Sequence, residues 1–222
     1  MTLTKTRAAA RAVPARPDLY RLFWAFLCAS VLGVLVETVF MLATWGVLMN
    51  RSGVLYGPFS LVWGAGAVLF TLLLYRLQPF GAWALFLGGA AAGTALEYFC
   101  SWLQEVLFGL RFWSYDHLPL NLNGRVCLPF SVFWGLAALV WMRLCWPALC
   151  ARLDRPRHPS RRLTRVLAAL LALDVALTAA ALLRMDQRQQ GVPPGNPVAV
   201  FLDWRFPDER LINHFTNVKY IG

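Results

Sequence analysis

Long stretches almost free of charged residues constrain this fold more than any other feature of the sequence. There are five of them, at residues 20–48, 59–77, 80–108, 126–149 and 164–184. A helix needs about 20 apolar residues to cross the hydrocarbon core of a bilayer, at about 1.5 Å per residue. Backbone groups in lipid must be satisfied within their own segment, and the alternating pattern of a barrel strand is absent. The sequence therefore predicts an all-α polytopic membrane protein with five transmembrane helices.

The charge distribution indicates topology rather than nucleic-acid binding. The chain has a net charge of +10, but only 14% of its 222 residues are charged, against about a quarter in soluble domains. The basic residues gather before the first apolar stretch and between the fourth and fifth, which five spans place on the same side. The positive-inside rule then predicts a bacterial cytoplasmic (inner) membrane protein with its N-terminus inside and its C-terminus outside. We expect these cations to contact membrane lipid and no nucleic acid.

An internal repeat relates two parts of the chain. Residues 33–37 and 93–97 both read Gly-x-x-x-Glu, and residues 58–64 share five of seven residues with residues 129–135. Each copy is two spans long, so both copies have the same orientation, as in a parallel repeat about an axis along the membrane normal. The second copy carries extra polar residues between its two halves, so we expect function where the copies meet.

The repeat suggests a domain organisation. A basic cytoplasmic tail precedes a membrane domain of five spans, residues 20–184, and an extracytoplasmic C-terminal tail follows it. The predicted parts are the basic tail at 1–19, repeat one at 20–77, repeat two at 80–149, the fifth span at 164–184 and the C-terminal tail at 185–222. The C-terminal tail is too aromatic for simple disorder, and we expect it to cover the outer mouth of the bundle.

Two glutamates lie within the predicted spans at matched depth. Glu37 and Glu97 each precede the predicted outer end of their span by 11 residues, which places them about 16 Å beneath it. An ionisable group there costs roughly 3 kcal/mol, so it should face the bundle interior and mark a functional site. We predict that the two carboxylates share a proton or hold a cation. The alternative is that each glutamate only holds neighbouring helices together, through a hydrogen bond with a group such as Tyr98. Asp174 lies near the same level without a counterpart in the repeat, which favours a structural role.

Further polar residues lead from mid-membrane to the outer surface. Glu97, Ser101 and Glu105 recur at every fourth position, as one face of a helix requires. Beyond them, the loop at 113–124 could bind a hard cation, a sugar or a lipid headgroup, or its Asx residues could simply form turns. The predicted substrate or proton site comprises Glu37, Arg51, Tyr56, Glu97, Ser101, Glu105, Trp113, Tyr115, Asp116, Asn121 and Asn123.

Several kinds of site are not indicated. The three histidines, His117, His158 and His214, are scattered without zinc-ligand spacing, and the five cysteines form no CxxC pair. There is no G-x-S-x-G elbow and no Walker Gly-x-x-x-x-Gly-Lys motif. The sequence thus predicts no metal site and no cofactor, although a divalent cation at the outer loop stays possible, and it identifies no catalytic residue.

Several of these motifs together carry a family resemblance. They are residues 50–58 leading to Trp63-Gly64-x-Gly66, residues 97–105, residues 112–116 and residues 121–124, with residues 201–211 at the C-terminus. Over roughly residues 20–218 the chain resembles the type IV, CmpB-like ABC transporter permeases, and it is similar to small transmembrane proteins of the 229 type. The resemblance implies a multi-span integral membrane protein. As an ABC permease it would need a separate ATPase chain, because it lacks a nucleotide-binding motif.

Three functional hypotheses follow. The first is a permease or transport component that moves a small solute or lipid through a carboxylate site open to the outer face. Five spans make a thin wall for a pathway, so a homodimer or partner subunits would be needed. The second is a membrane-embedded lipid-modifying enzyme that uses Glu97 or Asp116 as a general base or metal ligand. The third is a structural or regulatory membrane subunit in which the carboxylates only fix helix register.

Overall fold

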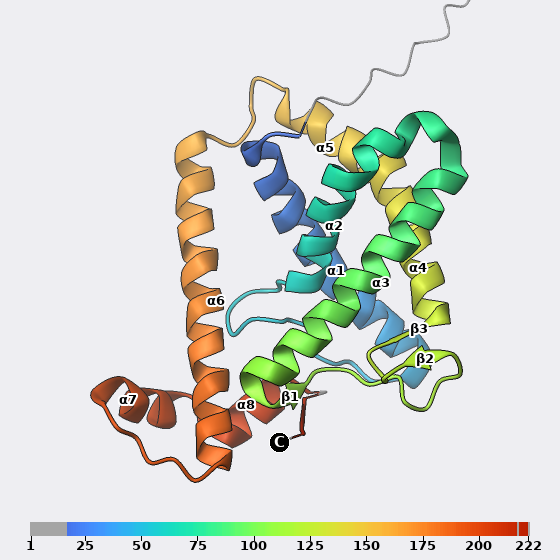
Figure 1. The fold of residues 1–222 in the computed structure, drawn as a ribbon. Coiled ribbons are helices and arrows are strands. Elements are labelled where there is room, and N and C mark those ends of the chain that lie inside the picture. The colour runs from blue at the N-terminus through green and yellow to red at the C-terminus, as the bar shows by residue number, and fades with distance from the viewer. Residues whose placement is uncertain (1–16, 217, 222) are drawn as a thin grey trace, which may run out of the picture.

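Long helices running between two ends dominate the computed structural model, which describes residues 17–216 and 218–221 (Figure 1). Most of the predicted basic tail at 1–19 lies outside the described residues. The eight α-helices of the described part are α1 (Leu19–Trp45), α2 (Leu61–Leu74), α3 (Gly81–Phe108), α4 (Leu128–Val140), α5 (Trp146–Leu153), α6 (Arg161–Gln189), α7 (Pro197–Arg205) and α8 (Asp208–His214). The predicted all-helical membrane fold is confirmed.

Within the described residues, four helical stretches are long and apolar enough to cross a membrane, where the sequence predicted five. They are Leu19–Trp45, Leu61–Phe108, Leu128–Leu153 and Arg161–Gln189. The 48-residue stretch Leu61–Phe108 contains both α2 and α3. The chain reverses between these two helices in a 3-10 turn, Tyr75–Phe80, so that α2 and α3 run in opposite directions (Figure 1). The turn ends at Gly81, whose φ of +90° is a conformation that other residues resist.

The third stretch is also interrupted. A π-helical segment, Trp141–Cys145, joins α4 to α5, and Pro147 follows in the first turn of α5. Proline has no N–H to donate, and a π-helical turn changes the hydrogen-bond register just before it. The π-helical turn thus accommodates Pro147 without ending the helical path. This path continues through α5 to Leu153, beyond the predicted end of the fourth span at residue 149.

Two short strand pairs lie at the end of the molecule where α1, α3 and α6 finish (Figure 1). Strand β1 (Leu110–Arg111) pairs antiparallel with β4 (Lys219–Tyr220), and β2 (Asn121–Leu122) pairs antiparallel with β3 (Val126–Cys127). The first pair joins the end of α3 to the C-terminal segment. We refer to this end of the molecule as the outer end, following the predicted orientation.

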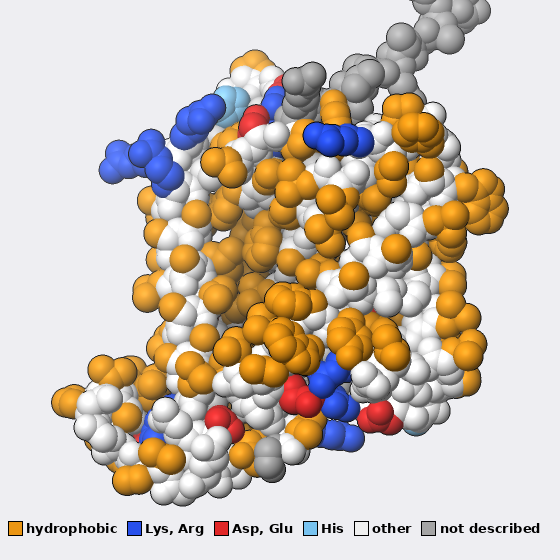
Figure 2. Space-filling view, viewed as in Figure 1, with side chains coloured by type: hydrophobic (Ala, Val, Ile, Leu, Met, Phe, Trp, Pro, Cys, Tyr) orange, Lys and Arg blue, Asp and Glu red, His pale blue; other side chains and the backbone are white. Residues whose placement is uncertain are grey.

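Apolar and charged side chains separate along the length of the molecule. Hydrophobic side chains cover its middle, and lysines and arginines gather at both ends (Figure 2). Inside, one core cluster joins the first five helices and includes Phe70, Leu85, Trp134 and Trp146. A second core cluster joins the outer part of α6 to the last two helices. The middle surface thus resembles one that faces lipid, while the second cluster folds the C-terminal segment onto the bundle.

Ion pairs also fix the C-terminal helices to α6. Arg184 donates to Asp203 at 2.8 Å, and Arg188 contacts both Asp203, at 2.5 Å, and Asp208. The hydrogen bonds from Arg184, and then from Arg188, lower the pKa of the Asp203 carboxyl below its ordinary value. The residues at 185–222, predicted as a tail, therefore include two folded helices with both apolar and ionic contacts to the bundle.

Replacing Asp203 should loosen α7. In the variant Asp203→Asn we expect faster amide hydrogen exchange over residues 197–205 at pH 7, because the charged acceptor of two arginines is lost. Because the pKa of Asp203 is lower in the folded protein, its carboxylate contributes fully to stability at pH values above about 3.9, the ordinary aspartate pKa. That contribution is lost as the pH falls through the pKa of Asp203 in the folded protein. The difference between the variant and the unchanged protein should therefore shrink in strong acid. The exposed Glu209→Gln serves as the control, and equal exchange in all three proteins would contradict the role of Asp203.

Candidate functional site

Glu37 and Glu97, the two glutamates of the repeated motif, each accept a hydrogen bond from a tryptophan. The indole Nε1 of Trp63 donates to Glu37 at 2.6 Å, and that of Trp134 donates to Glu97 at 3.0 Å. Trp63 and Trp134 occupy the same position in the two copies of the sequence motif, as do the two glutamates. The indole rings also touch, with their centroids 5.5 Å apart. The repeated residues therefore form two matched tryptophan–glutamate pairs that lie next to each other.

Glycines allow these tryptophans to approach. Gly33 and Gly93 lie one helical turn before their glutamates, and a Cβ at either position would overlap the indole of Trp63 or Trp134 respectively. Small residues of this kind let membrane helices pack closely. The Gly-x-x-x-Glu motif thus supplies both the surface for the indole and the acceptor for its N–H.

The remaining donors differ between the two pairs. The Nε of Arg51 donates to Glu37 at 2.8 Å in an ion pair. The hydroxyl of Tyr115 donates to Glu97 at 2.7 Å, and Glu97 is only 6% exposed. Each carboxylate therefore has its own partners, and among the described residues no hydrogen bond joins Glu37 to Glu97. One is balanced by a cation, while the other is held by two neutral donors.

The aromatic side chains of the outer loop close over Glu97. Tyr115 stacks on Phe130 at 4.7 Å between ring centroids, and Phe130 meets Phe40 of α1 edge-on at 6.3 Å. Burial, followed by the nearby Glu97 carboxylate, raises the pKa of the Tyr115 hydroxyl, so it stays protonated and can donate. Tyr115 thus couples the loop after α3 directly to the buried carboxylate.

A second polar cluster lies nearer the outer surface. Glu105 accepts from Arg111 at 2.8 Å and from Arg125 at 2.9 Å. Arg125 is itself buried and also donates to Ser101 at 3.3 Å, while Arg111 lies 3.6 Å from Asp116. Arginine side chains therefore fill the outer half of the predicted polar path, which runs from Glu97 through Ser101 to Glu105.

The amides of the outer loop form turns. Asn121 accepts from the backbone of Gly124 at 2.9 Å and donates to the carbonyl of Leu118 at 2.8 Å, and Asn123 donates to the Tyr98 hydroxyl. Gly124 has a φ of +64°. In the part of the chain that the structure describes, no group of three or more His, Cys, Asp or Glu could hold a metal ion. These contacts favour turn formation over cation binding.

The other side chains of this loop are also internally bonded. The indole of Trp113 donates to the backbone carbonyl of Arg125 at 3.0 Å, and Ser114 donates to Asp116 at 2.5 Å. An atom added at Gly124 would overlap the Asp116 carboxylate. The loop is therefore a tightly folded unit that covers the bundle.

Tyr56 and Asp174 lie apart from the glutamate pairs, where the loop after α1 meets the middle of α6. The backbone N–H of Tyr56 donates to one oxygen of Asp174 at 3.1 Å, and that of Leu55 donates to Thr178 at 3.0 Å. The Tyr56 hydroxyl accepts from Arg205 at 3.2 Å. Asp174 and Thr178 therefore hold the loop after α1 against α6. The other carboxylate oxygen of Asp174 is buried and has no hydrogen-bond partner in the described residues, and a structural role for Asp174 stays a prediction.

Sequence reasoning missed four residues of these clusters. The sequence places Trp63 and Trp134 in the repeat without indicating that they donate to the glutamates, and it does not indicate Arg111 or Arg125 as site residues. Two signals could have found them. The tryptophans recur at one position of the repeat, and the arginines flank the polar loop in a region otherwise poor in charge.

These features define the chain as a polytopic membrane protein with two neighbouring tryptophan–glutamate pairs between its helices. The chain belongs to the family described as "Putative ABC-transporter type IV", whose model matches residues 24–179. The predicted family resemblance is thus confirmed. Comparison with curated proteins and with solved structures gave no match. The matched residues include both tryptophan–glutamate pairs and the outer loop, and end before α7.

Valine in place of Gly93 should destabilise the protein. The added atoms would overlap the Trp134 indole and displace it from Glu97, and overpacking of this kind costs about 1–3 kcal/mol. Gly33→Val should act in the same way on Trp63. A lower unfolding temperature of the detergent-purified variants would show this. The control is Gly195→Val, at a glycine with open space around it. Unfolding temperatures unchanged at both helix positions would contradict the close packing.

Proposed function

We propose that this chain is a membrane transport component that moves a small solute or a lipid past the paired glutamates. The observation that carries this proposal is the contact between two matched tryptophan–glutamate pairs. Transporters built from repeats place their binding sites at the repeat interface, near the middle of the membrane. Membership of an ABC transporter family supports the same function.

The proposed topology has five passes in two parallel repeats. It treats α2 and α3 as separate spans, with the N-terminus in the cytoplasm and the C-terminus outside a bacterial inner membrane. In its support, the turn between α2 and α3 and the segment between α5 and α6 lie at the same end as the start of α1 (Figure 1). The basic residues between the fourth and fifth predicted spans lie at that end as well, as the positive-inside rule requires.

Interrupted helices support the repeat and the location of the site. Helix α2 has 14 residues before its 3-10 turn, and α4 has 13 residues before its π-helical segment. At about 1.5 Å per residue, each spans about 20 Å, less than the bilayer core of about 30 Å. These two helices are the second members of the two copies. Short or interrupted segments at corresponding positions of two halves are a sign of a transport site.

Within the site, Glu97 is the proposed group that binds and releases a proton or a substrate. Glu37 is neutralised by Arg51, whereas Glu97 has no Arg, Lys or His within ion-pair distance in the described part of the chain. A proton on Glu97, or a polar group of a substrate, can replace the donor Tyr115 when the outer loop moves. In this mechanism Arg51 fixes one half of the site, and Tyr115 closes the other half.

The proposed partners follow from the size of the chain. One bundle of this size has few helices with which to enclose a transport pathway, so we propose a homodimer or a complex with partner subunits. Because the sequence has no nucleotide-binding motif, energy from ATP would come from a separate ATPase chain. Apolar side chains exposed on α1, including Leu35, Val39 and Leu42, offer a surface for lipid or for a second subunit.

Glu97→Gln tests the proposed function. Cells lacking the gene would be complemented with the unchanged chain, with Glu97→Gln or with the exposed-site control Glu209→Gln. Solute and lipid contents of the cells, and of their medium, would be compared by mass spectrometry. We expect the unchanged chain and the control to restore the same metabolite or lipid, and Glu97→Gln to fail while it reaches the membrane in normal amount. An amide keeps the size of the side chain but cannot exchange a proton.

A structural or regulatory subunit is the second candidate, since all four carboxylate oxygens of Glu37 and Glu97 already have a donor. That function predicts a different result. Glu97→Gln would lower the amount of protein in the membrane, and whatever protein remained would be fully active. A normal level of Glu97→Gln with full restoration of the cell contents would contradict the transport mechanism at this residue.

A further inference from the structure

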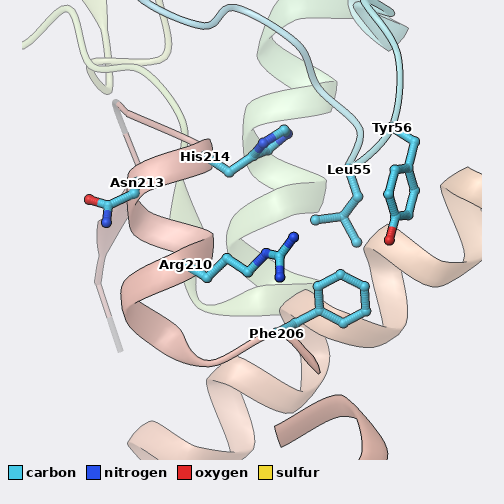
Figure 3. A pocket seen from close by; sticks show the side chains of 6 residues that line it. All are labelled: Leu55, Tyr56, Phe206, Arg210, Asn213 and His214. Atoms are coloured by element: carbon cyan, nitrogen blue, oxygen red, sulfur yellow. The ribbon is translucent and has the colours of Figure 1, made fainter. Parts of the chain in front are cut away.

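A pocket at the outer end lies apart from the two glutamates. It has a volume of about 260 Å³ and is formed by the loop after α1, by Phe206 and by α8 (Figure 3). Its lining residues are Leu55, Tyr56, Phe206, Arg210, Asn213 and His214. A water molecule takes up about 30 Å³, so the pocket can hold a group of several heavy atoms. Most of the lining comes from the C-terminal segment, beyond the residues that the family model matches.

Arg210, which lines this pocket, and Arg205, which donates to the Tyr56 hydroxyl beside it, differ from the other arginines of the outer end. Each of the other five forms an ion pair with a carboxylate, and these are Arg51, Arg111, Arg125, Arg184 and Arg188. In the described residues, Arg205 and Arg210 form no such pair. Their guanidinium carbons lie over the Phe206 ring, 5.1 Å and 5.9 Å from its centroid. Two cations without a carboxylate partner are therefore held beside one aromatic ring.

The other groups at the pocket add donors. The Tyr56 hydroxyl accepts from Arg205 at 3.2 Å, so its own hydrogen can be donated to a ligand. In Figure 3, Arg210, Leu55, Tyr56 and Phe206 face one another, and Asn213 points away from them. The nearby carboxylate of Asp208 is already occupied by Arg188. Guanidinium groups bind phosphate and carboxylate through parallel N–H donors.

The helix beside the pocket is suited to the membrane interface. Helix α7 exposes Val198, Val200, Phe201 and Trp204, with Trp204 75% exposed. It lies across the outer end of α6 rather than along it (Figure 1). Tryptophan is enriched where lipid headgroups begin, and helices that expose apolar side chains can lie in that layer. The pocket is thus near the expected level of the headgroups.

We propose that the pocket lined by Tyr56, Phe206 and Arg210, with Arg205 beside it on Tyr56, binds a phosphate-class anion. The position of α7 favours the headgroup of an anionic phospholipid as its source, and free phosphate is the other source of the same chemistry. The site is independent of transport through the glutamate pairs. It adds to the chain a specific contact for lipid or phosphate outside the family core.

Binding to the purified full chain tests this site. The protein in neutral detergent would be incubated separately with phosphatidylglycerol, with diacylglycerol, which lacks the phosphate, and with inorganic phosphate. Native mass spectrometry and the unfolding temperature report binding. The variant is Arg205→Gln with Arg210→Gln, and the control is Arg165→Gln, an exposed arginine near the opposite end of α6. Both variants should unfold at the temperature of the unchanged protein when no ligand is added.

We expect phosphatidylglycerol to bind and diacylglycerol not to bind. The double variant should bind phosphatidylglycerol at least about tenfold more weakly, because a hydrogen bond to a charged group contributes about 1.5–3 kcal/mol. Binding of inorganic phosphate that is lost in the double variant would support the anion site and identify free phosphate as a ligand. Equal binding of diacylglycerol and phosphatidylglycerol would overturn the proposal. So would binding of every anion unchanged by the double substitution.

Discussion

The cost of burying a carboxylate in an apolar environment governs the arrangement of this bundle. An ionised group away from water must find a cation or several donors, or take up a proton. Glu37 is met by Arg51 and Trp63, and Glu97 by Tyr115 and Trp134. These donors come from the loops and helices that follow each glutamate. Satisfying the two acids therefore brings together the parts of the chain that form the outer end.

The sequence predicted the helices well, because apolar length is a direct requirement of the bilayer. It also identified Glu37 and Glu97 as related residues, since each follows a glycine, Gly33 or Gly93, by four positions. Periodicity gives the depth and the face of a side chain. It does not show which loop will bring a donor, so the contact from Tyr115, 18 residues beyond Glu97, could not be read from the pattern.

The C-terminal segment shows a second limit of sequence reasoning. The sequence predicts a covering tail at residues 185–222, and it does not predict α7 or α8 within that tail. Their folding depends on long-range pairs, such as Arg184 with Asp203, and on apolar contacts of Leu202 and Phe206 with α6. Neither kind of contact leaves a local pattern. The pocket beside Phe206 was therefore out of reach before the structure was known.

The pairing of β1 with β4 has a consequence for biogenesis. Leu110 pairs with Tyr220, and the backbone N–H of Ile221 donates to the carbonyl of Gly109 at 2.9 Å. Ribosomes add residues in order, so β1 stays without its neighbouring strand until β4 has been synthesised. Contacts between such distant positions form slowly, because a long segment must first be closed into a loop. Assembly of this face therefore waits for the residues of β4, which are made long after α3.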